Sequence, residues 1–381
     1  MKIYWITEIH TDTLYKSSRF EVSNALKKRG HKVTLILQRT INEKHLSNEE
    51  YIALPTIDYR MIYKLIFGFF LFFYLPFIIK KGKADVIIID GVDIWTAFII
   101  PLKFLRIPLL LDIRSLKQNT KMSSESIFFS TSLSLSKYLV KGVTTITPEL
   151  KHVLVNTYGM KQDKIGIWTS GVSLENFTNQ SNVNDAIIKK GPSKPFTIMY
   201  HGSYSQYRGI ENIIQSLKNL DDEIRKNIQL LLVGFNMKEI DKLLLFCNQL
   251  GVSDLVRFVP QVPYEKIPSY ISVCDVGIIP LPPENEWCRE SSPLKTLEYL
   301  AMCKPIIATK IPFHQRIFEK GRCGILIENS EPESIAAAIT YLYKHKEELD
   351  SMGRTGREIV EKYYTWDKKA LDLEKFINTI V

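Results

Sequence analysis

Cysteine is scarce in this sequence, and its placement excludes two kinds of site. The chain of 381 residues contains five cysteines, all of them between Cys247 and Cys323. No two of them form a C-x-x-C pair. A small disulfide-stabilised scaffold and a structural zinc site both depend on paired or closely spaced cysteines. The cysteine content therefore argues against both, and it fits a protein of a reducing compartment.

Long apolar runs are missing as well. The apolar N-terminus, MKIYWIT, is too short for a signal peptide, so we expect a cytoplasmic protein. Residues 65–79, LIFGFFLFFYLPFII, are 15 residues without a charge. A membrane-spanning helix needs about 20 apolar residues, and Pro76 weakens a straight helix here. We therefore do not expect this segment to cross a membrane.

Two interpretations of residues 65–79 stay open, and both can hold. The segment can form a core helix, or it can dip an apolar face into a bilayer while Lys80, Lys81 and Lys83 meet anionic headgroups. The charge balance supports the second, because residues 1–180 hold 24 Lys and Arg against 15 Asp and Glu, whereas the remainder holds 26 against 26. Nucleic acid is not the expected partner, since basic residues cluster with exposed aromatics in such sites, whereas the aromatics here form an uncharged block. We expect a peripheral membrane contact.

Glycine is absent from the first polar loop, EIHTDTLYKSSR. This loop separates a strand predicted for residues 2–7 from a helix predicted for residues 20–28, and a second strand is predicted for residues 31–37. Such a βαβ opening predicts a parallel sheet with helices on both faces. Without glycines the loop is not a G-x-G-x-x-G fingerprint, which argues against an NAD-binding domain at the N-terminus.

The βα pattern runs twice along the chain and predicts an α/β protein with two doubly wound, Rossmann-like domains facing a central cleft. We predict a first domain at 1–178, a polar linker at 179–195, a second domain at 196–360 and a C-terminal helix at 361–381 that packs back on the first domain. Further strands are predicted at 86–89, 108–111, 143–146, 165–168, 197–200, 229–233, 257–259, 276–279, 306–307 and 324–327.

Polar residues follow two predicted strands of the first domain. Asp90 ends one strand, and Asp112 and Arg114 end the next. Ligands of such sheets bind in the crevice at the carboxyl ends of the strands. Arg114 is therefore a candidate for contact with a charged group, although it can equally serve as the partner of Asp112.

The stretch from Glu290 to Thr309, ESSPLKTLEYLAMCKPIIAT, dominates the second half. Proline suits the first helical position, so we predict a helix from Pro293 with Ser292 as N-cap, ending at Pro305. The free N–H groups of its first turn lie beside Lys295 and make a good anion site.

Two carboxylates flank this predicted anion site. Glu290 and Glu298 are eight residues apart, so in one helix they would point in different directions. A helix start at Pro293 instead places Glu290 in the preceding loop and Glu298 in the second turn. This arrangement suits a ligand with phosphate in the middle and hydroxyl-rich rings on either side. The plainer interpretation is a capped helix with two solvated glutamates.

A second phosphate-binding candidate is the loop from His201 to Gly209, HGSYSQYRG. It joins a strand to a helix, contains two glycines and carries Arg208 near its end. Backbone N–H groups and one fixed cation can hold a diphosphate. Many βα loops contain glycine and arginine without binding a ligand, so this loop indicates a phosphate site only in combination with the other motifs.

These motifs together resemble the retaining, nucleotide-sugar-dependent glycosyltransferases of the GT-B fold, the large group 1 (family 4) glycosyltransferases with the E-x7-E motif. HGSYSQYRG resembles their GR-x-x-x-x-KG loop, and LLLVGF resembles their strand ending in glycine. RFVPQVPYEKIPSYISVCDVGIIPL and ESSPLKTLEYLAMCKPIIAT resemble their donor-site segments. The likeness is strong from 197 to 330 and weaker from 8 to 140.

The resemblance implies roles for individual residues. Glu298 would bind the donor ribose, Glu290 would lie by the donor sugar, and Arg208 would hold the diphosphate. The remaining residues implied at the donor site are Lys295, the backbone N–H groups of Leu294 and Lys295, Ser292, Gly202, Ser203 and Gly234.

The sequence departs from the family pattern at several positions. Ser203 replaces the usual arginine after glycine, and Arg208 replaces the usual lysine. Arg114 stands where many members have a histidine, and we count it among the catalytic candidates. Ser170 and Ser173 replace the usual Asn and Asp of the NGVD segment.

The resemblance implies metal-independent transfer of a hexosyl or N-acetylhexosaminyl group with retention of configuration. No Asp-x-Asp metal motif occurs in a suitable context, and no cofactor beyond the nucleotide-sugar donor is expected. Arginine, lysine and a helix N-terminus would stabilise the leaving diphosphate. The acceptor is expected to be a lipid-linked glycan or polysaccharide at the cytoplasmic face of the membrane, in cell-envelope polysaccharide biosynthesis. The alternative is a non-catalytic GT-B module that binds a membrane or a partner glycosyltransferase.

Overall fold

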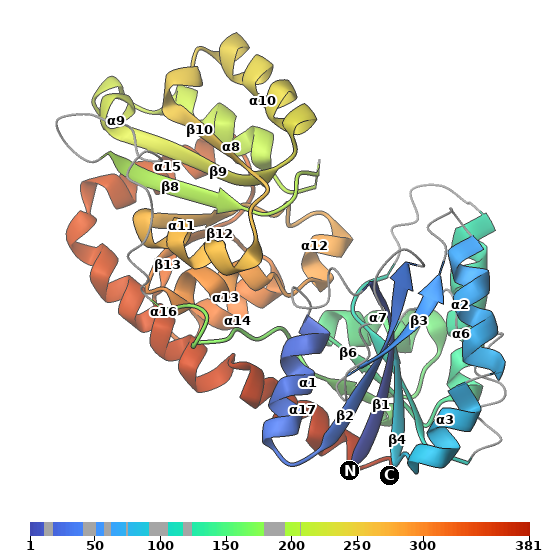
Figure 1. Ribbon diagram of the computed structural model, residues 1–381. Coiled ribbons are helices and arrows are strands. Elements are labelled where there is room, and N and C mark those ends of the chain that lie inside the picture. Colours follow the sequence, from blue (N-terminus) through green and yellow to red (C-terminus); the bar gives the residue numbers. More distant parts are fainter. Residues whose placement is uncertain are drawn as a thin grey trace. The chain divides into compact units, whose positions relative to one another are not determined.

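The computed structural model describes residues 1–10, 18–40, 51–56, 62–73, 75–90, 106–116, 124–178, 195–205 and 207–381. The chain divides into two compact units, shown in Figure 1. Unit 1 combines Met1–Ser170 with Trp366–Val381, and unit 2 is Gly171–Thr365. Each unit is an α/β layer structure around its own parallel sheet, as the sequence predicts.

Unit 1 has a seven-stranded parallel sheet in the order β3-β2-β1-β4-β5-β6-β7. From β1 the chain first builds outward through β2 and β3, and then returns to place β4 on the other side of β1. The order of the strands therefore reverses between β1 and β4, the position where doubly wound sheets bind ligands. The strands are β1 (Lys2–His10), β2 (Lys32–Thr40), β3 (Tyr51–Thr56), β4 (Val86–Asp90), β5 (Leu109–Ile113), β6 (Gly142–Thr145) and β7 (Ile165–Ile167).

Helices cover both faces of this sheet. On one face α1 (Ser18–Lys28) packs against α17 (Trp366–Ile377), the last helix of the chain. Arg29 and His31, just after α1, both contact the carboxylate of Glu374 on α17. The opposite face is covered by α2 (Ile62–Phe73), α3 (Leu75–Gly82), α6 (Ser124–Leu139) and α7 (Pro148–Tyr158), which contribute to one apolar core with the sheet.

Unit 2 repeats the plan with six parallel strands in the order β10-β9-β8-β11-β12-β13. Its order reverses between β8 and β11. The strands are β8 (Phe196–His201), β9 (Ile228–Phe235), β10 (Val256–Pro260), β11 (Val276–Ile279), β12 (Ile306–Thr309) and β13 (Gly324–Ile327). The helices are α8 (Ile210–Ser216), α9 (Asp222–Asn227), α10 (Met237–Leu250), α11 (Ile267–Val273), α12 (Glu286–Glu290), α13 (Leu294–Ala301), α14 (Pro312–Phe318), α15 (Pro332–Lys344) and α16 (Leu349–Tyr363).

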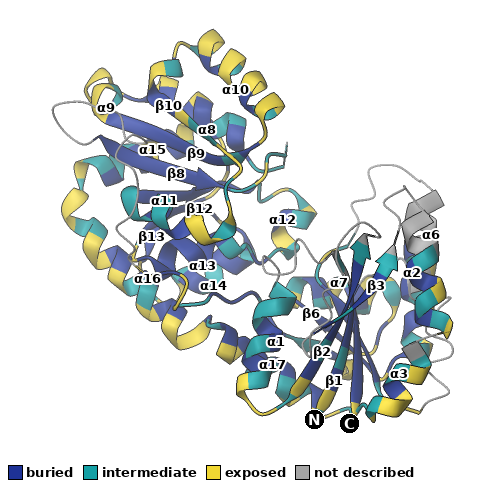
Figure 2. Cartoon of the chain, in the orientation of Figure 1, coloured by how far each residue is buried: buried dark blue, intermediate teal, exposed yellow. Residues whose placement is uncertain are grey.

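The inner strands of unit 2 are buried on both faces, as Figure 2 shows. Every residue of β8, β11 and β12 is buried. Strands covered on both sides are continuous apolar runs rather than alternating ones, which is why short sequences such as VGII and IIAT form them. Two separate apolar clusters occupy the two faces of this sheet.

The structure corrects the prediction for the region around the apolar segment. Strand β3, with the sequence YIALPT, was not predicted, and it lies at the edge of the sheet beside β2. Residues 65–79 do not form one helix, because the segment is divided between α2 and α3, with Pro76 near the start of α3. Proline is tolerated in a first helical turn but not in a helix interior. Among the described residues, no helix is long and apolar enough to cross a membrane.

The boundaries of the two units also differ from the predicted ones. Residues 171–178 belong to unit 2, not to the first domain, because Val172 pairs with Thr365 and Phe177 lies in an apolar core of unit 2. On the C-terminal side, unit 1 resumes at Trp366 rather than at residue 361. The predicted linker lies outside the described residues except for its last residue, Pro195.

Gly277 of β11 sets the distance between the unit 2 sheet and α13. A Cβ atom at this position would lie 2.4 Å from the ring of Tyr299. Overpacking of this kind costs about 1–3 kcal/mol, so Gly277→Ala is expected to lower the free energy of unfolding by that amount in urea titrations. In a Tyr299→Leu background the same substitution should cost much less. Equal costs in both backgrounds would contradict this account of the contact.

Candidate functional site

Helix α13 begins one residue later than the sequence predicts. Pro293 is the N-cap and not the first helical residue, and Ser292 therefore does not cap the helix. The reason lies in the backbone of Pro293, whose φ of −65° suits a helix whereas its ψ of 118° is extended. The helix also ends earlier than Pro305, at Ala301, and Cys303 adopts a positive φ of 55°.

The apolar side of α13 fixes its first turn over the sheet. Leu297, Tyr299 and Leu300 are fully buried, and the Tyr299 hydroxyl donates a hydrogen bond of 2.7 Å to the carbonyl of Met199 on β8. The first backbone N–H groups of a helix, here those of Leu294 and Lys295, have no carbonyl within the helix to bond. They provide the positive end of the helix dipole that the sequence predicted as an anion site.

Glu290 lies at the end of a helix, which corrects the expected loop position. It is the last residue of α12, and Ser291 to Pro293 separate it from α13. Burial, and secondarily the charge of Glu286 one turn earlier, raise the pKa of Glu290 to about 7, against the smaller effect of Arg289. A carboxyl with this pKa can exchange its proton near neutral pH.

Lys295 is the buried cation of the site. Its Nζ donates a 2.9 Å hydrogen bond to the Tyr200 hydroxyl and lies 4.0 Å from the centre of that ring. A Cβ atom on Gly202 would lie 3.1 Å from the same Nζ. Gly202 has a φ of +122°, and Gly234, whose Cβ position would lie 3.2 Å from the Gly202 carbonyl oxygen, has a φ of +103°. Glycine is therefore favoured at both positions, and a side chain on Gly202 would crowd the cation.

The charge of Lys295 is poorly compensated. Burial lowers its pKa well below the ordinary value, the guanidinium of Arg208 lowers it further, and only Glu298 opposes these two effects. A buried cation next to a second cation is costly unless an anion joins it. The pair therefore favours an anionic ligand.

Glu298 is buried in the second turn of α13. Its Oε1 accepts a 2.7 Å hydrogen bond from the Tyr264 hydroxyl, and its Oε2 lies 3.3 Å from His201 Nε2. Burial raises the pKa of Glu298 to about 7, against Tyr264 and Lys295, which both lower it. Burial and the charge of Lys295 lower the pKa of His201 to about 3. The imidazole is therefore neutral, and its contact with Glu298 is a polar contact rather than an ion pair.

The loop from His201 to Gly209 carries the second cation. The Arg208 guanidinium lies over the ring of Trp287 on α12, 4.9 Å from its centre, and its buried Nε has no hydrogen-bond partner among the described residues. Ser203 is exposed, and its carbonyl accepts a 3.3 Å hydrogen bond from Tyr200. Gly209 has a φ of +67° and begins α8 close to the carbonyl of Pro280.

A buried chain of two hydrogen bonds links α13 to α14 and to the end of β12. His314 on α14 donates through Nδ1 to the carbonyl of Thr309, at 2.7 Å, which leaves Nε2 to accept from the Thr296 hydroxyl at 3.0 Å. Burial lowers the pKa of His314 to about 4, so the ring is neutral in the folded protein. This chain ties the site helix to the end of β12.

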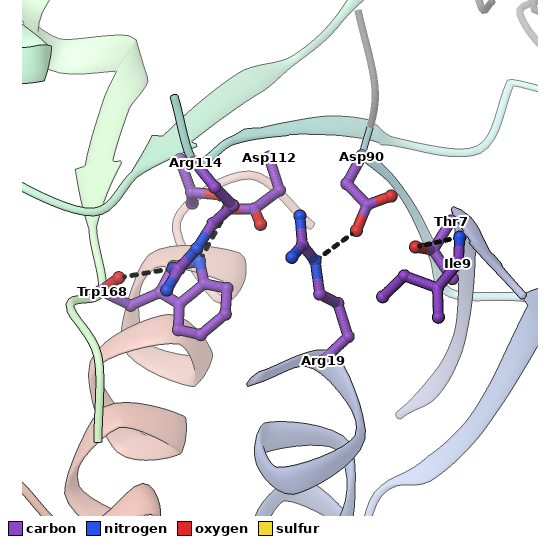
Figure 3. Close-up of polar contacts among 8 residues, drawn as sticks. Thr7, Ile9, Arg19, Asp90, Asp112, Arg114 and Trp168 are labelled. Atoms are coloured by element: carbon purple, nitrogen blue, oxygen red, sulfur yellow. Dashed lines mark hydrogen bonds and ion pairs between the residues drawn. The ribbon is translucent and has the colours of Figure 1, made fainter. Parts of the chain in front are cut away.

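Unit 1 holds a separate polar cluster at the carboxyl ends of its central strands, shown in Figure 3. Arg19 at the start of α1 bonds Asp90 at 2.5 Å. Asp112 is fully buried and accepts hydrogen bonds from Thr144, at 2.7 Å, and from the Trp168 indole, at 2.9 Å. Burial raises the pKa of Asp112, against the charges of Arg114 and Arg19.

Arg114 is placed by Trp168 more than by Asp112. Its guanidinium lies 3.8 Å from the centre of the Trp168 ring and donates a 3.0 Å hydrogen bond to the Trp168 carbonyl (Figure 3). Burial lowers its pKa to about 9, with Asp112 opposing, so the group stays charged at neutral pH. The partnership with Asp112 that the sequence left open is thus electrostatic, without a hydrogen bond among the described contacts.

The structure brings most of the predicted donor-site residues of unit 2 together. Gly202, Gly234, Lys295 and Glu298 are linked by contact or by charge, and Arg208 lies close enough to lower the pKa of Lys295. The sequence did not predict roles for Tyr200, His201, Tyr264 and Trp287. His201 was detectable from its place at the end of a predicted strand, whereas nothing local marks Tyr264 or Trp287.

Two parallel sheets of this kind, each covered by helices, make up the GT-B fold of glycosyltransferases, which solved structures of similar fold share. The family model described as "Glycosyl transferases group 1" matches residues 183–359, and the model described as "Glycosyltransferase Family 4" matches residues 20–176. The chain therefore belongs to the group 1 glycosyltransferases.

Two similar proteins are also glycosyltransferases by name. A D-inositol 3-phosphate glycosyltransferase of Paenarthrobacter aurescens is 26% identical over 238 residues, which are 60% of this chain and 55% of that protein. The chain thus spans about half the length of that relative. The capsular polysaccharide biosynthesis glycosyltransferase CapM of Staphylococcus aureus is 22% identical over 317 residues, 80% of this chain and 77% of CapM.

Among solved structures, Alr3699/HepE of Anabaena is similar over all of both chains. Its complex with UDP has a TM-score of 0.75 at 13% identity, and its complex with UDP-glucose a TM-score of 0.73 at 12% identity. At such identities the likeness concerns the fold alone.

The neutral state of His314 gives a prediction on pH. Because its pKa is about 4 in the folded chain and about 6.5 in the unfolded chain, the unfolded state binds more protons between these values, and stability is lost as pH falls through that window. The stability of the wild type minus that of His314→Gln, from urea titrations, should therefore fall by up to roughly 3 kcal/mol from pH 7 to pH 4. Substitution of the exposed His152 is the control, and a pH-independent difference for His314 would contradict its neutrality.

Proposed function

We propose that the chain transfers a sugar from a nucleoside-diphosphate-sugar donor to a glycan or lipid-linked acceptor, without a metal ion and with retention of anomeric configuration. One observation carries the proposal. Lys295, in the first turn of α13, lies beside Gly202, where a Cβ atom would come within 3.1 Å of its Nζ, and a second cation, Arg208, lies close enough to lower its pKa. Family membership and the complexes of HepE with UDP and UDP-glucose support a nucleotide-sugar as the ligand.

The diphosphate of the donor is assigned to this cation site. As the bond between the sugar and the diphosphate breaks, negative charge grows on the leaving phosphate. Lys295, Arg208 and the N–H groups of Leu294 and Lys295 would stabilise that charge in a site already poor in anions. The family pattern has a basic residue at both of these loop positions. Ser203 is exposed and carries no charge, so Arg208 is the one basic residue of the loop that would bind the diphosphate. The leaving phosphate is proposed to help deprotonate the acceptor.

Glu298 is assigned to the ribose of the donor. A carboxylate binds two vicinal hydroxyls well when its own orientation is fixed, and Tyr264 and His201 contact its two oxygens. Because the raised pKa of Glu298 reflects burial without enough donors, hydroxyl groups of a ligand would supply the missing hydrogen bonds.

Glu290 is assigned to the donor sugar. Its carboxyl lies at the end of α12, the helix that also carries Trp287 under Arg208. When ionised, it would stabilise the positive charge that develops on the sugar ring during transfer. Its pKa of about 7 places that ionisation within the physiological range.

The acceptor is assigned to the crevice of unit 1, with Arg114 as its charged contact. The name of CapM supports a role in polysaccharide biosynthesis, and a lipid-linked glycan at the cytoplasmic face of the membrane is the acceptor class that we propose. Trp168 holds the Arg114 guanidinium in place, so this residue can bind an anionic group of the acceptor without reorganisation.

The two glutamates give separable predictions in a panel of UDP- and GDP-sugars. One donor should raise the melting temperature of the wild type. Glu298→Gln should weaken its binding about 10- to 100-fold, because charged hydrogen bonds contribute about 1.5–3 kcal/mol. Glu290→Gln should leave binding within about threefold and slow donor hydrolysis about 100-fold.

The pH dependence of hydrolysis tests the role of Glu290 further. The wild-type rate should rise through pH 7 as Glu290 ionises, and the residual rate of Glu290→Gln should not. Glu286→Gln is the matched control on the same helix: it should keep activity and move the rise to lower pH. If no nucleotide-sugar changes the melting temperature and Glu290→Gln has no effect, the enzymatic proposal is wrong.

Trp287 is predicted to position Arg208 for the diphosphate. Trp287→Leu should weaken binding of the donor found in the panel by about five- to tenfold, because stacking with a guanidinium contributes about 0.5–2 kcal/mol. Trp287→Phe retains an aromatic face and should bind within about twofold of the wild type, in titration calorimetry on variants of unchanged melting temperature. Normal binding by the leucine variant would show that Arg208 is placed by other contacts.

A further inference from the structure

Half of the large exposed apolar side chains among the described residues belong to three helices of unit 1. Phe69 and Phe73 on α2, Phe77 on α3, and Leu135 and Tyr138 on α6 are exposed, whereas five others are spread over the rest of the described chain. Phe69, Phe73, Phe77, Leu135 and Tyr138 are together called the aromatic face below. Contiguous exposed apolar patches are uncommon on proteins without a partner for them.

Helices α2 and α3 are apolar on two sides. Phe67, Leu71 and Ile79 are buried in the core of unit 1. On the outer side Phe69, Phe73 and Phe77 are 58%, 64% and 67% exposed. A surface helix ordinarily presents polar residues outward, so packing within unit 1 explains only one side of these helices. Exposed positions on α2 and α3 are yellow in Figure 2.

Helix α6 extends this face. Phe129 and Leu133 on α6 join the same core cluster as α2 and α3, so the three helices cover one face of the sheet. Leu135 and Tyr138 lie on the outer side of α6, with exposures of 48% and 71%. The five residues of the aromatic face therefore lie on helices that cover the same face of the sheet, and they come from more than one stretch of sequence.

Basic residues border the aromatic face. Lys80, Lys81 and Lys83 are exposed at and just after the end of α3, and Lys141 is exposed just after α6. Residues 62–83 contain no Asp or Glu at all. An apolar surface edged by cations is complementary to one in which hydrocarbon and negative charge lie side by side.

A pocket adjoins the C-terminal end of α6. It has a volume of about 410 Å³, and Lys137, Lys161 and Lys164 line it together with apolar residues that include Val143 and Ile165. Ammonium groups and apolar side chains in one pocket suit an amphiphile with an anionic head. The pocket thus offers the same combination of chemistry as the aromatic face beside it.

We propose that the aromatic face and its lysines bind the surface of an anionic phospholipid bilayer, with one lipid headgroup in the pocket at Lys137, Lys161 and Lys164. Helix α2 has 12 residues, about 18 Å in length, so it lies along the surface and does not cross it. A second copy of the chain is a poorer partner, because a twofold interface would bring the lysines of both copies together. Vesicle binding needs neither donor nor acceptor, so this proposal stands or falls separately from sugar transfer.

Vesicle flotation of the full chain tests the proposal. The vesicles are made of phosphatidylcholine alone or with about 30% phosphatidylglycerol, which is enough to give a negative surface. The wild type should float with the anionic vesicles, and less so as salt rises. Phe69→Ser/Phe73→Ser/Phe77→Ser should lower the bound fraction at least tenfold. Lys161→Ala/Lys164→Ala should lower it roughly fivefold per lysine on anionic vesicles only. Inorganic phosphate should not compete.

The matched control is Met237→Ser/Leu245→Ser, which removes two exposed apolar side chains from α10 of unit 2. This variant should float like the wild type, and all variants should keep the wild-type melting temperature, since the residues are exposed. Failure of the wild type to float with anionic vesicles would overturn the proposal, as would equal losses in the α10 control. A dimer in sedimentation that the triple serine variant abolishes, without vesicle binding, would assign the face to self-association instead.

Discussion

The burial of Lys295 is the constraint on which the candidate site depends. An ammonium group removed from water needs compensation, and the described contacts supply only a tyrosine hydroxyl and ring, a nearby carboxylate and a second, repelling cation. The position is therefore electrostatically incomplete, and an anionic ligand would complete it. Gly202, with its positive φ, lets the backbone approach the ammonium group closely, because any side chain at this position would crowd it. This combination of charge and glycine backbone is the basis of the proposed phosphate site.

Packing further inside unit 2 places that lysine. Helix α13 can approach the sheet closely only because Gly277 leaves room for the Tyr299 ring, whose hydroxyl then bonds Met199. The neutral imidazole of His314 joins the same helix to the end of β12. Tyr299 and His314 are fully buried. The first turn of α13 is consequently held by apolar burial and neutral hydrogen bonds, which leaves the charged groups to interact with a ligand.

Unit 1 uses its two sheet faces and its strand ends differently. One face is sealed by α1 and α17, helices from opposite ends of the sequence, and the carboxyl ends of its strands gather Asp90, Asp112 and Arg114. The other face is covered by α2, α3, α6 and α7, and the first three of these helices expose large apolar side chains. The internal packing of unit 1 does not explain the exposed apolar side chains or the charged cluster at the strand ends. The proposed bilayer would cover the first, and the proposed acceptor would contact the second.

The sequence by itself determined the α/β class, the two doubly wound sheets and the family, because buried parallel strands are continuous apolar runs and the glycine, glutamate and lysine positions follow the spacing of the family motifs. The donor-site roles that it suggests for Gly202, Lys295 and Glu298 stay predictions. It placed Ser292 as a cap and Glu290 in a loop, since local propensity cannot reveal that Pro293 has an extended ψ or that α12 runs up to Glu290. Only the tertiary structure decided that Tyr264, His201 and Trp287 surround the site, that Arg114 stacks on Trp168, and which side of α2 is exposed. Each of these depends on contacts between residues far apart in the chain, which no local pattern encodes.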